Sequence, residues 1–153
     1  MLKKKIIVSA CLLGQRCRYD GQTKEFSEVL EFLKGYEVLP FCPEAPLFGT
    51  PRERISVVHV KGENRIISDE TNRDVTEELQ EYTQSFLLQH TSVNKALLKS
   101  KSPSCGYNTT PILDEAKQQI SVGNGVAADI FLSHNIDIIS ENNYLKEVED
   151  ELK

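Results

Sequence analysis

The 153-residue sequence contains no tryptophan, a single methionine and no long hydrophobic run. A membrane-spanning helix needs roughly 18 or more consecutive apolar residues, and the apolar runs here are far shorter. Residues 1–14 have three lysines near their start but contain only a short apolar stretch, so they predict a first strand and not a signal peptide. We therefore expect a cytoplasmic protein with no membrane partner.

The sequence also lacks the patterns of a disulfide-rich or zinc-finger protein. It has four cysteines but no Cys-x-x-Cys pair, which is the usual spacing of a structural zinc site. A chain of this size buries about 70% of its extended surface on folding, so its core needs no disulfides. Cytoplasmic thiols stay reduced, and we expect the cysteines to serve as ligands or nucleophiles.

Positive charge is scarce as well. Eighteen Lys and Arg residues stand against 23 Asp and Glu residues, which gives a formal net charge of −5. Proteins that bind duplex or transfer RNA usually carry a basic footprint. Only short basic clusters occur in this sequence, at Lys3–Lys5, Arg52/Arg54 and Lys99/Lys101. The charge therefore favours a small-molecule partner over a nucleic acid.

The hydrophobic pattern predicts an α/β fold in a single domain. Short apolar runs predict strands at Lys5–Ala10, Glu37–Phe41, Ile55–Val60, Asn64–Ser68, Lys95–Lys99 and Ile136–Ser140. Helical spacing predicts helices at Lys24–Leu33, Thr76–Gln89 and Val126–Leu132. This alternation favours a mostly parallel open sheet flanked by helices, with the strands of residues 55–68 as a β-hairpin appendage. The domain should span residues 1–142, followed by an acidic C-terminal tail over residues 143–153.

Three cysteines share one local context. Cys11, Cys42 and Cys105 each follow a predicted strand and lie in a turn rich in Pro, Gly or Ser. Ligands of open α/β sheets bind at the carboxyl edge of the strands, so the fold would bring the three thiols to one edge. Thiolates hold iron–sulfur clusters and also select zinc and copper. A metal or iron–sulfur site is the first hypothesis, and three small buried hydrophobes are the alternative.

Cys17 lies in the same predicted loop as Cys11. As a fourth ligand it would complete a structural or electron-transfer cluster, whereas three thiolates leave one metal corner open for a ligand. Both alternatives remain open from the sequence. A tyrosine-phosphatase cradle needs Cys and Arg separated by five residues, and the sixth residue after Cys11 is Cys17 and not an arginine. The spacing therefore excludes that reaction.

Polar side chains accompany the cysteines. Glu44 follows Cys42 by two residues, and the flanking prolines hold its backbone. A partly buried carboxyl group in such a site is a candidate general acid or base, and a solvated loop glutamate is the alternative. Ser102 and Ser104 precede Cys105. Their hydroxyls would orient a substrate, bond to cluster sulfurs or cap a turn.

Six motifs together resemble a known family. They are VSACLLGQRCRYDG, FCPE, GTPRER, NRDVT, LLKSKSPSCG and VGNGVAADIF. The chain resembles, from Lys5 to about Asn142, the 2-thiouracil desulfidase family of small bacterial and archaeal proteins, formerly a domain of unknown function. The resemblance implies an α/β fold and an oxygen-sensitive [4Fe-4S] cluster held by Cys11, Cys42 and Cys105. It also implies a fourth iron open to the substrate sulfur, with Glu44 and Ser102 nearby.

We therefore predict a [4Fe-4S]-dependent desulfidase that removes sulfur from a thiolated nucleobase such as 2-thiouracil and releases hydrosulfide. The reaction would be a hydrolase-like C–S cleavage without redox change. Glu44 and Ser102 are the predicted catalytic residues, for proton transfer and substrate orientation respectively. The alternatives are a non-catalytic iron–sulfur or sulfide carrier or sensor, and a structural zinc protein.

Overall fold

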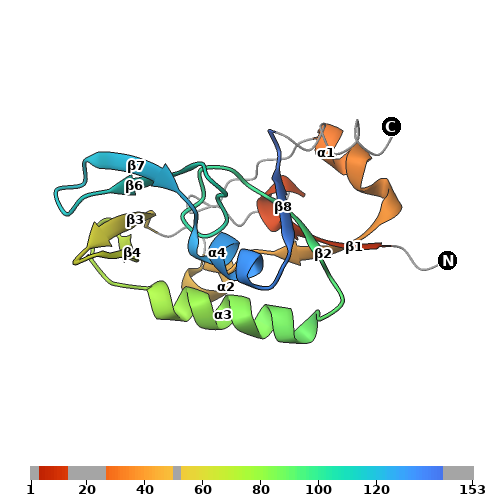
Figure 1. The fold of residues 1–153 in the computed structure, drawn as a ribbon, viewed down its shortest axis with the longest axis horizontal. Helices are drawn as coiled ribbons and strands as arrows, with labels where there is room; N and C mark the ends of the chain where they lie inside the picture. The colour runs from red at the N-terminus through yellow and green to blue at the C-terminus, as the bar shows by residue number, and fades with distance from the viewer. Residues whose placement is uncertain (1–3, 14–26, 50–52, 143–153) are drawn as a thin grey trace.

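The described part of this computed structural model, residues 4–13, 27–49 and 53–142, contains eight strands, four α-helices and two 3-10 turns, Ala10–Leu12 and Leu33–Gly35 (Figure 1). The strands are β1 (Lys4–Ser9), β2 (Tyr36–Phe41), β3 (Ile55–Val60), β4 (Glu63–Ser68), β5 (Lys95–Leu98), β6 (Thr110–Leu113), β7 (Gln119–Gly123) and β8 (Asp137–Ser140). The helices are α1 (Ser27–Phe32), α2 (Glu44–Phe48), α3 (Thr76–Gln89) and α4 (Val126–Ser133). Among the described helices, none has both the length and the apolar character needed to cross a membrane.

The first sheet is entirely parallel, with the order β2-β1-β5-β8. Pro40 lies in β2, an edge strand, which is where sheets tolerate proline. Side chains alternate along β1: Ile6 and Val8 pack with α1, while Ile7 packs on the other face with Phe131 of α4. Helices thus cover both faces, as parallel sheets require, and the α/β prediction is confirmed.

The predicted β-hairpin is half of a second sheet. Its order is β4-β3-β6-β7; β3 pairs antiparallel with β4 and parallel with β6, and β6 pairs antiparallel with β7. Lys61 and Gly62 form the two-residue turn of the hairpin with φ angles of 51° and 83°, as tight hairpin turns favour. The hairpin was predicted from the sequence, but β6 and β7, which join it to form the sheet, were not.

Helix α3 connects the two sheets by packing on both. Leu79 in its first half joins the core of the second sheet with Val57 and Ile112, and Leu87 in its second half joins the core of the first sheet. Figure 1 shows α3 running beneath both sheets. The two sheets are therefore held in one domain by a shared helix.

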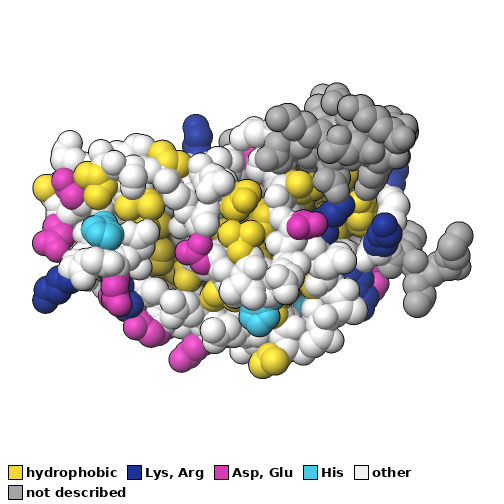
Figure 2. All heavy atoms as spheres, in the orientation of Figure 1, with side chains coloured by type: hydrophobic (Ala, Val, Ile, Leu, Met, Phe, Trp, Pro, Cys, Tyr) yellow, Lys and Arg dark blue, Asp and Glu magenta, His cyan; other side chains and the backbone are white. Residues whose placement is uncertain are grey.

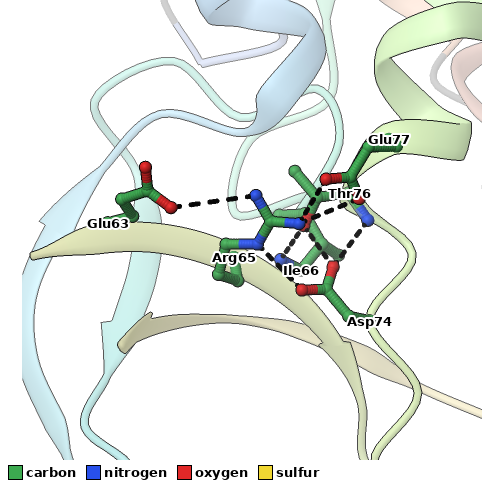
Figure 3. Close-up of polar contacts among 6 residues, drawn as sticks. All are labelled: Glu63, Arg65, Ile66, Asp74, Thr76 and Glu77. Atoms are coloured by element: carbon green, nitrogen blue, oxygen red, sulfur yellow. Dashed lines mark hydrogen bonds and ion pairs between the residues drawn. The ribbon is translucent and has the colours of Figure 1, made fainter. Parts of the chain in front are cut away.

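A polar network fixes the start of α3 to β4 (Figure 3). The Arg65 guanidinium donates hydrogen bonds to Asp74 Oδ2 at 2.8 Å and to Glu77 Oε1 at 2.7 Å. The hydrogen bond from Arg65 lowers the pKa of Glu77. Burial pushes the pKa of Asp74 upward, but hydrogen bonds from Arg65 and Thr76 outweigh it and the pKa is lowered. Both carboxyl groups therefore stabilise the fold as anions.

Acidic side chains gather over the hairpin and the first half of α3 on the face drawn in Figure 2. This distribution accords with the net charge of −5. Three sequence predictions fall outside the described residues: the position of Cys17, the first residues of the helix 24–33, and the tail 143–153.

Candidate active site

Three neighbouring strands of the first sheet end at one edge and continue into loops that carry the predicted cysteines. Cys11 lies in the 3-10 turn after β1, Cys42 directly follows β2, and Cys105 lies in the loop after β5. Because β1 is paired with both β2 and β5 in a parallel sheet, the three loops leave the same edge. Cys11 and Cys42 are half-buried and Cys105 is buried.

One cavity of about 500 Å³ contains all five predicted site residues in its lining. They are Cys11, Cys42, Glu44, Ser102 and Cys105. The second sheet supplies further wall residues, Ile55, Ser56, Val57, Thr110, Pro111 and Leu113. The volume lies within the range of small-molecule sites. The structure thus brings the predicted residues together, and β3 and β6 add a wall that the sequence did not reveal.

Phe41, the last residue of β2, anchors the loop that carries Cys42 and Glu44. Its ring lies 4.9 Å from that of Phe86 and 5.2 Å from that of Phe131, centroid to centroid, and it is 1% exposed. Three residues later, Glu44 begins the short helix α2, so the carboxylate extends from the first turn of a helix. The aromatic cluster therefore fixes where the Glu44 side chain enters the cavity.

The two serines of the β5–β6 loop have different partners. Ser102 Oγ accepts hydrogen bonds from the backbone N–H of Ser104 at 3.0 Å and of Cys105 at 3.1 Å. It lies 3.5 Å from Glu44 Oε2, whereas Ser104 Oγ donates to the same carboxylate oxygen at 2.9 Å. The structure therefore couples Glu44 directly to the loop that carries Cys105.

The N-terminus of α4 holds this loop in place. The N–H of Ala127 donates to the Ser104 carbonyl at 2.7 Å, and that of Val126 donates to the Pro103 carbonyl at 3.2 Å. Gly125, which precedes the helix, also donates to the Gly106 carbonyl at 2.7 Å. The first amides of a helix have no partner within the helix, so the loop satisfies them while being fixed by them. The motif VGNGVAADIF thus supplies, through Gly125, Val126 and Ala127, the backbone donors that hold the Cys105 loop.

Glu141 supports the same loop from its other end. Its side chain is 4% exposed and accepts a hydrogen bond from the Ser100 N–H at 2.8 Å, and it pairs with Lys99 Nζ at 2.9 Å. The Lys99 N–H in turn donates to Ser9 Oγ at 2.9 Å, which links the ends of β5 and β1. A single glutamate before an acidic tail gives no sequence signal of burial, so this role was not predicted.

Burial in the site raises the pKa of the Cys105 thiol well above its ordinary value. Burial is the main cause, a hydrogen bond with Ser9 acts in the opposite direction, and negative charge at Cys42, Cys11 and Glu44 adds to the rise. Positive side chains in the cavity lining come from Arg54, Lys99 and Lys101. Cationic charge placed between the three thiols would stabilise them as thiolates.

The spacing of the donors is informative about the kind of metal site. Across residues 4–13, 27–49 and 53–142, no three His, Cys, Asp or Glu side chains are grouped closely enough to hold one metal ion. In a four-iron cluster each cysteine binds a different iron, so its thiolates stand further apart than the ligands of a single ion. Three soft sulfur donors around a shared cavity are a donor set that suits an iron–sulfur cluster.

Comparisons with known proteins point to one family. Residues 6–143 match the family model described as 2-thiouracil desulfurase. The chain is 32% identical over 149 residues to the uncharacterized protein YbbK of Bacillus subtilis (strain 168), covering 90% of this chain and 95% of YbbK. It is also similar to the solved structure of TudS, named as a [4Fe-4S]-dependent thiouracil desulfidase, with 36% identity and a TM-score of 0.76 over 99% of this chain and 100% of that chain. The chain therefore belongs to the 2-thiouracil desulfurase family.

Proposed function

We propose that this protein is a [4Fe-4S]-dependent desulfidase that removes sulfur from a thiolated nucleobase such as 2-thiouracil. The observation that carries the proposal is the single cavity where three strand-end cysteines meet the Glu44 carboxylate and the Ser102 hydroxyl. Membership of the 2-thiouracil desulfurase family and the similarity to TudS support it. The net reaction is thiocarbonyl plus water to carbonyl plus hydrogen sulfide, and it needs no oxidant or reductant.

Cys11, Cys42 and Cys105 would hold the cluster. They follow three adjacent strands of the first sheet and line the same cavity, and thiolates are the usual ligands of such clusters. When bound, the cluster supplies a Lewis-acidic iron for the thione sulfur, which makes the adjacent carbon more electrophilic. The side chains of the protein would then position the nucleobase and the attacking water and would transfer protons.

Glu44 would act as the proton-transfer residue. It lies at the first position of α2, half-buried at the cavity wall, and its Oε2 accepts the Ser104 hydrogen bond. The carboxylate would take a proton from the water that attacks the thiocarbonyl carbon, and the C–S bond would then break as hydrosulfide leaves. A carboxylate held beside a small-molecule cavity is well placed for this work.

Ser102 would orient the substrate by donating a hydrogen bond from its hydroxyl group. Its oxygen already accepts two backbone N–H groups, from Ser104 and Cys105. These bonds use the acceptor capacity of the hydroxyl, so the remaining O–H points away from the loop backbone. Its nearest carboxylate oxygen, Glu44 Oε2, lies at the long distance of 3.5 Å. A ring heteroatom of a bound base would offer the hydroxyl a better acceptor.

Replacing Glu44 by glutamine tests whether the protein is an enzyme or a carrier. Glu44→Gln keeps the shape and an acceptor for Ser104, so iron content and 2-thiouracil binding should match the wild type. General acid–base catalysis contributes roughly 10²–10⁴-fold, and sulfide release should fall by about that factor. The matched control is Glu31→Gln on α1, an exposed carboxyl group outside the cavity lining, which should leave the rate unchanged. A Glu44→Gln protein with the wild-type rate would rule out the proton-transfer role. A wild-type protein that binds 2-thiouracil without releasing sulfide would favour the carrier or sensor.

A further inference from the structure

Ser104 contacts Glu44, the candidate general base, but does not face the substrate cavity. It is 0% exposed and does not contribute to the cavity lining, unlike Ser102 and Cys105 on either side of it. Yet its Oγ donates to Glu44 Oε2 at 2.9 Å, a shorter contact than the 3.5 Å from Ser102 Oγ. A buried hydroxyl that bonds to a carboxylate from behind the cavity wall acts on the carboxylate and not on a ligand.

The backbone of Ser104 is fixed on both sides. Its N–H donates to Ser102 Oγ at 3.0 Å, and its carbonyl accepts from the Ala127 N–H of α4 at 2.7 Å. Gly125 packs so closely that a Cβ there would lie 2.6 Å from the Ser104 carbonyl oxygen. The hydroxyl is therefore presented to Glu44 from a backbone that has little freedom to move.

We propose that Ser104 is a positioning residue for Glu44, which it holds in the orientation needed for proton transfer. This inference rests on the proposed function, which it deepens by dividing the work of the two serines. Ser102 faces the cavity and is available to the substrate, whereas Ser104 lies behind the cavity wall and holds the Glu44 carboxylate. The same hydrogen bond joins the loop that carries Cys42 to the loop that carries Cys105.

A double-mutant cycle separates this role from a purely structural one. Kinetics of sulfide release from 2-thiouracil would be measured on reconstituted wild type, Ser104→Ala, Glu44→Gln and the double variant. A hydrogen bond to a charged group is strong enough that Ser104→Ala should lower kcat roughly 10- to 100-fold. KM should change less than about twofold, because Ser104 does not touch the substrate. In the Glu44→Gln background the further loss should be less than about twofold, because the two residues act as a unit.

The matched control is Thr83→Val. Thr83 is also 0% exposed, and its hydroxyl donates to the Leu79 carbonyl at 2.8 Å within α3, away from the cavity lining. Removing the Thr83 hydroxyl should leave kcat for sulfide release unchanged. Ser104→Cys keeps the shape of the side chain, is slightly larger and offers only a weak S–H donor. If the alanine variant does not fold, the same loss of kcat is expected for the cysteine variant.

Three results would overturn the inference. The first is that Ser104→Ala lowers kcat by the same factor in the wild type and in the Glu44→Gln variant. The second is that the Ser104→Ala protein loses iron. Either result would make Ser104 a structural support of the loop. The third comes from a crystal structure of the variant, where we expect the Glu44 carboxylate to leave its wild-type position. An unmoved carboxylate would contradict the positioning role. That last measurement involves no substrate, so it judges Ser104 even if 2-thiouracil is not turned over.

Discussion

Gly125 should tolerate no side chain, although its backbone conformation is ordinary. Its φ is −72°, which any residue adopts. The effect of a substitution therefore depends only on whether a side chain fits sterically. An alanine Cβ would lie 2.5 Å from the carbonyl carbon of Ser104 and 2.8 Å from the backbone nitrogen of Cys105. Both are backbone atoms, and ordinary Cβ contacts begin at 3.4 Å. The loop that carries Ser102 and Cys105 would therefore have to retreat by nearly 1 Å.

The expected cost has two parts. Overpacking of this kind destabilises a protein by about 1–3 kcal/mol, and a misplacement of about 1 Å in a catalytic site lowers rates by about 10²-fold. We therefore expect Gly125→Ala to lose about 1–3 kcal/mol in urea unfolding and about 10²-fold in sulfide release, with reduced iron after anaerobic reconstitution.

The control is Gly35→Ala, where a Cβ would meet no atom within 4 Å. This variant should stay within about 0.5 kcal/mol of the wild type in stability and should retain its iron and its rate. A Gly125→Ala protein with wild-type iron content and turnover would refute the reasoning, because the close approach of α4 to the loop would then have no consequence for the site.

Two further predictions concern the ligands and the pH dependence of stability. Alanine at Cys11, Cys42 or Cys105 should abolish the visible absorption of the reconstituted protein, whereas Cys17→Ala should largely spare it; the opposite pattern would overturn the ligand assignment. Arg65→Gln should be less stable than the wild type near neutral pH, because Arg65 lowers the pKa of Glu77 and contributes to the lowered pKa of Asp74. A lowered carboxyl pKa contributes its full stabilisation above the unfolded value of about 4 and loses it as the pH falls through the lower, folded value, so this difference should shrink below about pH 4. A constant difference between pH 7 and pH 3 in urea unfolding would contradict this prediction.

The strand ends were predictable because their pattern is local. An apolar run followed by a turn rich in Pro, Gly or Ser marks β1, β2 and β5, and each such turn holds a cysteine. Once the sheet was expected to be parallel, the side-by-side placement of Cys11, Cys42 and Cys105 followed from topology. Helix α3 was predicted at its observed bounds, Thr76–Gln89, because its apolar residues repeat with helical spacing.

The second wall of the cavity was not predictable from local pattern. Strand β7, Gln119–Gly123, alternates polar and apolar residues over only five positions, and four of these residues are exposed in the structure; it was not predicted. Strand β6 has only four residues, and Pro111 interrupts its pattern. It becomes a strand through parallel pairing with β3, where Val57 lies beside Ile112, residues far apart in the sequence. Tertiary context of this kind outweighs β-propensity.

The support of the site was hidden for a similar reason. Ser102 and Ser104 flank the same proline in the sequence, and it is the folded loop, held by hydrogen bonds to α4, that places Ser102 in the cavity lining and Ser104 behind it. Glu141 likewise looks like a surface acid, but the fold buries it against Lys99 and Ser100. Long-range contacts assign these roles, so they follow from the structure and not from composition or spacing.

The most direct test of the central claim is one anaerobic assay on the reconstituted protein. The holo protein, carrying about four iron atoms per chain, would be incubated with 2-thiouracil while uracil and hydrosulfide are both quantified. The proposed function predicts that uracil and hydrosulfide form in equal amounts over many turnovers, without an added reductant and without loss of visible absorption. Binding of 2-thiouracil with no product, a requirement for a reductant, or a protein that retains zinc in place of iron would contradict it.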